Sequence, residues 1–507
     1  MKSTLFARFG LSSMILFGAL ASSACQTPAK APGPVASAQK ADPRYAKLPE
    51  PGPRKAWAPP PAKKLAMPNG QTLWLLERPN TPLVTLEVIL PRGSATDPVG
   101  KAGLTRITAD LLDEGAGPMG ALELSEAFDL ISTDYSAEVT TDATLLTLNG
   151  LSESFERALE LLQYILKAPA LAESEFQRRK QQHLAEALSR KDEPGQLLKE
   201  QLHRQVFGEG YLGLPTEGTE ATLEAIQLAD VRKHAAGLIA AEGAHFVVVG
   251  PLSEARAMRL FSRFFSDWKG KSTLTNRTLA AHTPSPNVQI VPFPGAAQTA
   301  LGVAKRAGNA LAPEYYRELV MNERLGGSFT SRINLNLRED KGYTYGAVSL
   351  FQRYREAGLF AVMANVQAQA TGPSLVEIFN ELGAICGDRP LSAAERNEAV
   401  DGLLLGYPLR FESTHAIAAQ LATLPLFDRP LDFYQAWPSR IDAVTVADAQ
   451  ASTAPYCRRE DFDVVLVGDP EVILPQLEKI GAPSQIVKMP EAAPPPKVSA
   501  PAKNPKK

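Results

Sequence analysis

The chain has 507 residues, 44% of them hydrophobic, and its 53 basic and 55 acidic side chains leave a net charge of −2. This length is too great for one ordinary hydrophobic core and predicts two to four domains. The composition is typical of a soluble globular protein, and the balanced charge gives no electrostatic argument for nucleic-acid binding.

Residues 1–25 have the pattern of a bacterial secretory signal peptide. Lys2 and Arg8 precede an apolar run over residues 11–21, and this run is too short to span a bilayer. Small residues then precede Cys25. This pattern resembles the lipobox of bacterial lipoproteins and predicts that Cys25 is lipidated. Ordinary cleavage of the signal peptide within residues 19–24 is the alternative. We expect a periplasmic protein, anchored in the outer membrane because Gln26 is not the aspartate of inner-membrane retention.

Two segments, residues 26–63 and 483–507, are rich in proline, alanine and lysine. Ten prolines lie between Pro28 and Pro61. Because this composition cannot bury a core, both segments are predicted to be disordered, the first as a tether to the membrane.

The globular part begins at Lys64. Asn69-Gly70 predicts a hairpin turn, and residues 73–77 and 83–90 predict two strands that pair with each other. Apolar periodicity predicts further helices and strands up to residue 250. The helices are expected at 103–113, 122–131, 155–166 and 173–191, and the strands at 136–140, 144–149 and 245–250.

A repeat indicates that the globular part is duplicated. Residues 224–230 recur as 442–448, and the apolar run 247–250 recurs as 465–468, both 218 residues later. The common offset predicts two homologous halves, residues 64–280 and 281–482, each of the α+β class.

Cys386 and Cys457 are the other two cysteines. They could pair in an oxidising compartment or be small buried apolar side chains, and their isolation in the sequence favours the second interpretation.

In the second half, Gly326, Gly327 and Ser328 lie between two predicted helices. The first helix covers residues 314–324, and the second has apolar residues at 329, 333 and 337. Two adjacent glycines let the backbone approach a neighbouring element closely where a helix ends.

Beyond the second helix, Gly342 interrupts the pattern and residues 345–351 predict a strand. Arg338 is therefore near a helix end and Tyr345 at a strand start, where both can face one groove. A helix-surface arginine in a salt bridge and a tyrosine in the core are the plainer interpretation.

This succession of residues closely resembles the Arg/Tyr signature in the C-terminal half of the insulinase-like zinc peptidases, which include pitrilysin and the mitochondrial processing peptidase. In that family an arginine and a tyrosine seven residues later contact the substrate carbonyl. The matching positions are Arg338 and Tyr345, and the resemblance places Gly326, Gly327 and Ser328 at the substrate. It also implies that each half has a mainly antiparallel sheet covered by helices.

Active members of the family carry His-x-x-Glu-His on the first long helix, where the histidines bind zinc and the glutamate activates water. The matching positions hold Arg106, Ala109 and Asp110, which do not make such a site. Glu186 falls near the family's distant zinc ligand, but a solitary glutamate on a polar helix is typical of a solvated face. The histidines do not supply a helical ligand pair, because no two are three or four residues apart.

We therefore expect this chain to bind no cofactor and to be inactive alone. By the resemblance, it would be the substrate-orienting subunit of a heterodimeric peptidase, in which a homologous partner holds zinc and the substrate is a peptide or unfolded polypeptide. A structural, assembly or peptide-binding subunit of an envelope complex is the alternative. A cryptic peptidase site within this chain is a third hypothesis.

Overall fold

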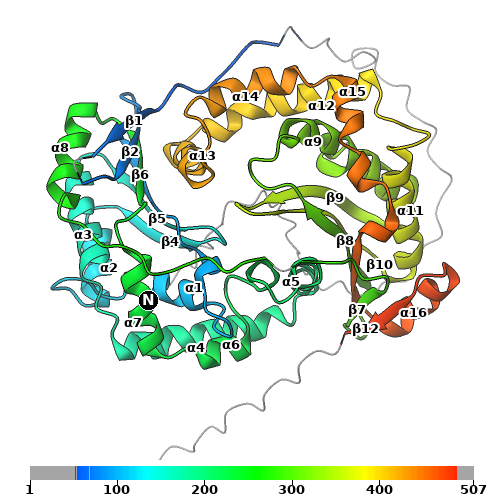
Figure 1. The fold of residues 1–507 in the computed structure, drawn as a ribbon, viewed down its shortest axis with the longest axis horizontal. Helices are drawn as coiled ribbons and strands as arrows, with labels where there is room; N and C mark the ends of the chain where they lie inside the picture. The colour runs from blue at the N-terminus through cyan, green and yellow to red at the C-terminus, as the bar shows by residue number, and fades with distance from the viewer. Residues whose placement is uncertain (1–51, 53, 68, 280, 488–507) are drawn as a thin grey trace, which may run out of the picture. The chain divides into compact units, whose positions relative to one another are not determined.

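The computed structural model describes residues 52, 54–67, 69–279 and 281–487. Within these residues the chain from Ala56 onward forms one compact unit. It contains two six-stranded sheets with helices packed on them, so the predicted α+β class with two similar halves is confirmed (Figure 1). None of the described helices is long and apolar enough to cross a membrane. The predicted signal peptide and Cys25 lie outside the described residues.

The first sheet has the strand order β1-β2-β6-β3-β5-β4, and only β2 and β6 run parallel. The hairpin between β1 and β2 is confirmed, and Gly70 has a φ of 86° in its turn. The predicted pairing of the next two strands is wrong, because β6 inserts between β2 and β3. The strands are β1 (Lys63–Ala66), β2 (Thr72–Glu77), β3 (Leu83–Leu90), β4 (Asp134–Val139), β5 (Thr144–Leu151) and β6 (His245–Gly250).

The second sheet repeats this arrangement in the order β12-β7-β11-β8-β10-β9. Its parallel pairs are β7 with β11 and β7 with β12, and the other neighbours are antiparallel. Strand β11 follows β6 by the 218 residues of the sequence repeat. The strands are β7 (Val288–Pro292), β8 (Gln298–Ala307), β9 (Thr344–Arg353), β10 (Gly358–Gln367), β11 (Asp463–Gly468) and β12 (Ser484–Ile486).

The helices of the first half agree with the predicted ones where a prediction was made. They are α1 (Leu104–Asp110), α2 (Ala121–Leu130), α3 (Phe155–Lys167), α4 (Glu173–Arg190), α5 (Pro194–Phe207), α6 (Glu220–Ala225), α7 (Leu228–Leu238) and α8 (Glu254–Phe265). Those of the second half are α9 (Tyr315–Asn322), α10 (Arg332–Asn334), α11 (Thr371–Ala384), α12 (Ala393–Gly406), α13 (Thr414–Leu426), α14 (Phe433–Asp442), α15 (Val446–Ala451) and α16 (Pro470–Lys479).

Two helices that were not predicted from the sequence each pack on the sheet of the other half. Helix α5 of the first half packs on β8 and β11, and α13 of the second half packs on β3 and β6 (Figure 1). A β-carbon at Gly302 of β8 would collide with Leu198 and Leu202 of α5, so glycine permits this close packing. Each sheet is therefore covered on one face by a helix from the other half.

Ends of the two predicted disordered segments are packed. The centroid of the Trp57 ring lies 5.7 Å from the centroid of the Tyr407 ring and 5.6 Å from that of the Phe411 ring. At the other end, β12 lies within residues 483–507 and pairs with β7. Apolar contact and strand pairing thus order the parts of these segments nearest the globular core.

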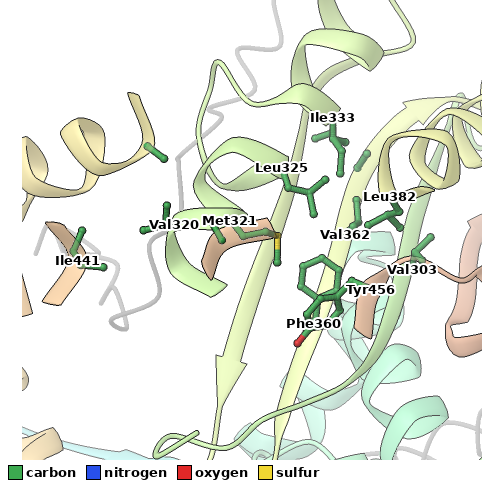
Figure 2. Close-up of a cluster of buried hydrophobic side chains, with 14 of the residues drawn as sticks. Val303, Val320, Met321, Leu325, Ile333, Phe360, Val362, Leu382, Ile441 and Tyr456 are labelled. Carbon is green, nitrogen blue, oxygen red and sulfur yellow. The ribbon is translucent and has the colours of Figure 1, made fainter. Parts of the chain in front are cut away.

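The largest buried cluster lies between the second sheet and its helices and continues along α13 to the first sheet. Figure 2 shows Leu325 and Ile333 pointing toward Phe360 and Val362 of β10, and all four are fully buried. The residues on either side of Gly326-Gly327 are thus anchored in the core.

Cys386 and Cys457 form a disulfide, with their Cα atoms 5.9 Å apart. The prediction of two unpaired apolar cysteines is therefore wrong. The loop after α11 and the segment before β11 are brought together by the fold, although the two residues are 71 apart in sequence.

Candidate functional site

The segment from α9 to β9 is a chain of short helical turns. A π-helical turn, Glu323–Gly327, continues α9, and a second one, Leu335–Asp340, continues α10. Gly342 then has a φ of 65°, in the left-handed region where glycine is favoured, and β9 begins at Thr344. The predicted helix end at Arg338 and strand start at Tyr345 are confirmed.

Gly326 lies against the edge of the second sheet. A β-carbon there would collide with Ser349 of β9, so the predicted close approach of the backbone is confirmed. Asn322 of α9 donates to the Ser349 carbonyl at 3.0 Å, which further covers this edge. Ser328 Oγ donates to the Glu323 carbonyl at 2.9 Å and closes the turn. These contacts give Gly326 and Ser328 a structural role, and substrate contact by Gly326, Gly327 and Ser328 stays a prediction.

Arg338 has few protein partners. Its side chain is 31% exposed, and its Nε atom is 3.5 Å from Glu339 Oε1. The guanidinium carbon lies 4.3 Å from the centre of the Phe329 ring. Nη1 is buried and has no hydrogen-bond partner among the described residues. Arg338 therefore makes the salt bridge of the plainer interpretation, with Glu339, and its guanidinium keeps donor capacity for another group.

Tyr345 is 78% exposed, at the start of the edge strand β9. The plainer interpretation, a tyrosine in the core, is therefore wrong. Asn334, which is 3% exposed, ties this strand to the loop of Phe329: its Nδ2 donates to the Phe329 carbonyl at 2.6 Å, and its Oδ1 accepts from Ala347 N at 3.0 Å. The loop that touches Arg338 is thus fixed to the strand that carries Tyr345.

Arg332 of the same segment contrasts with Arg338. It makes a bidentate ion pair with Glu395, with both N–O distances 2.7 Å, and donates to the Arg389 carbonyl at 2.5 Å. The pKa of Glu395 is lowered to about 2, mainly by the hydrogen bonds from Arg332. The donors of Arg332 are thus used within the protein.

The three positions that match His-x-x-Glu-His lie on α1. Arg106 Nε is 3.0 Å from Asp110 Oδ2, and His183 Nε2 of α4 is 2.9 Å from the same oxygen. Ala109 is fully buried. Sequence reasoning missed His183, because no sequence spacing relates it to α1. A guanidinium and an imidazole therefore share one carboxylate oxygen at this position.

Glu186 lies one turn beyond His183 on α4. It is exposed, as predicted, and accepts from Gln182 at 3.1 Å. Its Oε2 is 3.6 Å from His183 Nδ1. Within the described part of the chain, no group of three His, Cys, Asp or Glu side chains is placed to hold a metal ion.

Further carboxylates beside this cluster are also paired with cations. Glu114 accepts from Arg178 and Arg179 of α4, each at 2.5 Å. Burial raises the pKa of Asp113 to about 6, against the opposing charge of Arg179. The surroundings of α1 thus hold fixed positive charge where a zinc site would need free ligands.

Comparison with known proteins gives a consistent family assignment. The family model described as insulinase (peptidase family M16) matches residues 73–220, and the model of the peptidase M16 inactive domain matches residues 225–403. Together the two matches cover more than half of the chain, and the second begins within the predicted first half and extends into the second half. Both halves are therefore similar to M16 domains.

Individual relatives are distant in sequence but similar over most of their length. An uncharacterized zinc protease of Rickettsia bellii is 24% identical over 317 residues, which cover 62% of this chain and 76% of that protein. The non-peptidase homolog YmxG of Helicobacter pylori is 19% identical over 388 residues, covering 76% and 89%. The crystal structure of a peptidase M16 inactive domain from Pseudomonas fluorescens has a TM-score of 0.75 at 22% identity, covering 80% and 98%.

Proposed function

The chain belongs to the insulinase family of peptidases, M16, and we propose that it acts there as a non-catalytic, substrate-orienting subunit of a heterodimeric zinc peptidase. The observation that carries this proposal is the ion pair between Arg106 and Asp110, at the positions of the family's zinc ligands. A guanidinium stays charged at every physiological pH and cannot bind a metal. Zinc, in this proposal, is held by a homologous partner subunit.

The second half would supply Arg338 and Tyr345 to the partner's site. Peptide hydrolysis needs a metal-activated water and also hydrogen-bond donors for the oxyanion that develops on the substrate carbonyl. The Arg338 side chain is 31% exposed and its guanidinium keeps donor capacity, and Tyr345 presents its side chain to solvent. Both features suit groups that pair with a substrate rather than with the fold.

A structural, assembly or peptide-binding role without catalysis is the second candidate. The name of the Helicobacter pylori relative, a non-peptidase homolog, favours it, and so does the absence of zinc ligands at α1. Arg338 favours the first candidate, because its guanidinium is partly exposed and keeps donor capacity that a purely structural role does not require.

For location we propose export to the periplasm and a lipid anchor on Cys25. The disulfide between Cys386 and Cys457 supports export, because disulfides persist in oxidising compartments and are rare in the cytosol.

The test is steady-state cleavage of a quenched peptide by this chain reconstituted with a homologous subunit that carries His-x-x-Glu-His. Arg338→Ala and Tyr345→Phe should each lower kcat and kcat/KM by roughly 10²- to 10³-fold, as for other lost oxyanion donors. Arg338→Lys should also be impaired, because an ammonium lacks the planar fork of donors.

Arg259→Ala is the matched control, since Arg259 is exposed on α8 in the first half. Gel filtration checks that each complex assembles. Full activity of both Arg338→Ala and Tyr345→Phe in intact complexes would reject the catalytic role and leave the scaffold role.

A further inference from the structure

Phe329 is an unusually exposed aromatic residue beside Arg338. The sequence pattern predicts it on the apolar face of a helix with Ile333 and Leu337, but those two are buried and Phe329 is 64% exposed. It lies in the loop before α10, not in a helix. A phenylalanine left in water forgoes about 1.5–3 kcal/mol of burial free energy, and this one stands directly beside the guanidinium of Arg338.

The ring is nonetheless held in place. The Phe329 carbonyl accepts a 2.6 Å hydrogen bond from the buried Asn334, which also binds Ala347 N of β9. Asn334 therefore links the loop to β9. This fixes where the ring stands relative to Arg338 and to the start of β9.

Stacking on this ring limits the orientation of Arg338. With the guanidinium carbon 4.3 Å from the ring centre, the cation lies within cation–π distance, and one face of the guanidinium is covered. Nη1 is buried without a partner among the described residues, so the donors that a ligand can reach lie on the exposed part of the side chain, which is 31% exposed. A peptide carbonyl oxygen is an acceptor of the required kind.

We propose that Phe329 is a positioning residue for Arg338 and a specificity contact for the substrate. One face of the ring holds the guanidinium so that the donors on its exposed part meet the carbonyl of a bound peptide. The exposed part of the ring contacts the side chain beside that carbonyl and favours a large apolar or aromatic residue there. This inference rests on the proposed function of Arg338.

The test uses the same reconstituted complex with three variants of Phe329 and two quenched peptides. The peptides differ only in having leucine or serine beside the scissile bond. Phe329→Ala should lower kcat about tenfold and remove the preference for the leucine peptide, whereas Phe329→Tyr should restore both, because phenol keeps the aromatic face. Phe329→Leu should keep the preference for leucine but not the kcat, since it is apolar without a π-system.

The outcomes separate this inference from the proposed function. Normal kcat in Phe329→Ala and Phe329→Leu, with Arg338→Ala impaired, overturns the role of Phe329 and leaves the proposed function intact. Normal kcat in Arg338→Ala overturns both. Failure of Phe329→Ala and Phe329→Leu to assemble with the partner, seen by gel filtration, overturns the positioning role and makes Phe329 a subunit contact.

Discussion

The hydroxyl of Thr85 on β3 donates a 2.9 Å hydrogen bond to the hydroxyl of Thr414 at the start of α13, across 329 residues of sequence. Both side chains are buried. The bond ties the first sheet to a helix of the second half. Because α5 makes the reciprocal contact with β8 and β11, neither half buries its sheet without the other. We infer that the two halves unfold together.

Glu87 lies on the face of β3 that α13 covers, two residues after Thr85. It is 3% exposed, and its Oε2 atom has no hydrogen-bond partner among the described residues. Burial, with a smaller contribution from the charge of Glu138, raises the pKa of Glu87 from 4.5 to about 8. Between these pH values the folded protein keeps a proton that the unfolded chain releases. Stability is therefore fully present below about pH 4.5 and falls as pH rises through 8.

Glu87→Gln should remove this loss of stability. The variant should match the wild type near pH 5 and exceed it at pH 9 by roughly 4 kcal/mol, at about 1.4 kcal/mol for each tenfold change in proton affinity. Urea unfolding from pH 5 to pH 9 measures the difference. Glu126→Gln is the control, because Glu126 is exposed on α2 and should change the pH profile little. A difference between variant and wild type that does not depend on pH would contradict the assignment.

The disulfide yields a second prediction. Replacing Cys386 and Cys457 together by serine should lower the free energy of unfolding by about 2–4 kcal/mol, because the crosslink restricts the unfolded chain. Thiol titration of the unfolded protein should find both cysteines unreactive until a reductant is added. Cys25→Ser serves as the control for cysteine content. Two reactive thiols without reductant, or unchanged stability of the double variant, would show that the bond does not form.

Local patterns predicted the elements well, and long-range relations were missed. The runs at 83–90 and 245–250 matched β3 and β6, because a short, mainly apolar run is typical of a buried strand, although β3 also contains Thr85 and Glu87. Their adjacency was missed, since about 150 residues separate them. The same holds for the contact of His183 with Asp110 and for the disulfide.

The turns around Gly326 and Gly342 could be predicted from the sequence for a physical reason. Gly326 and Gly342 are required locally, one by the approach of β9 and the other by a positive φ. The exposure of Phe329 could not be predicted from the sequence, because an apolar residue at helical spacing normally faces the core. Only the loop geometry set by Asn334 turns it outward.

The lipid anchor is tested on the mature N-terminus. Mass spectrometry of the purified protein should find Cys25 as the acylated first residue, and membrane fractions should contain the protein. Cys25→Ser should release it into the soluble periplasmic fraction, with the disulfide unchanged. An unmodified mature N-terminus would show ordinary cleavage of the signal peptide instead.

The last prediction concerns the α1 positions. The wild-type chain should contain no stoichiometric zinc after dialysis, because Arg106 already neutralises Asp110 and His183 Nε2 lies 2.9 Å from the same oxygen. Arg106→His combined with Asp110→His would place two imidazoles one turn apart on α1, near His183 and Glu186 of α4. This double variant should bind about one zinc per chain, measured by elemental analysis and by titration with a chromogenic chelator. Arg106→Ala is the matched control: it removes the cation without adding a ligand, and it should bind no zinc.

Without a glutamate at Ala109 to activate water, the zinc-loaded double variant should still hydrolyse no peptide. Stoichiometric zinc in the wild-type chain, with peptidase activity that a chelator removes, would refute the non-catalytic assignment.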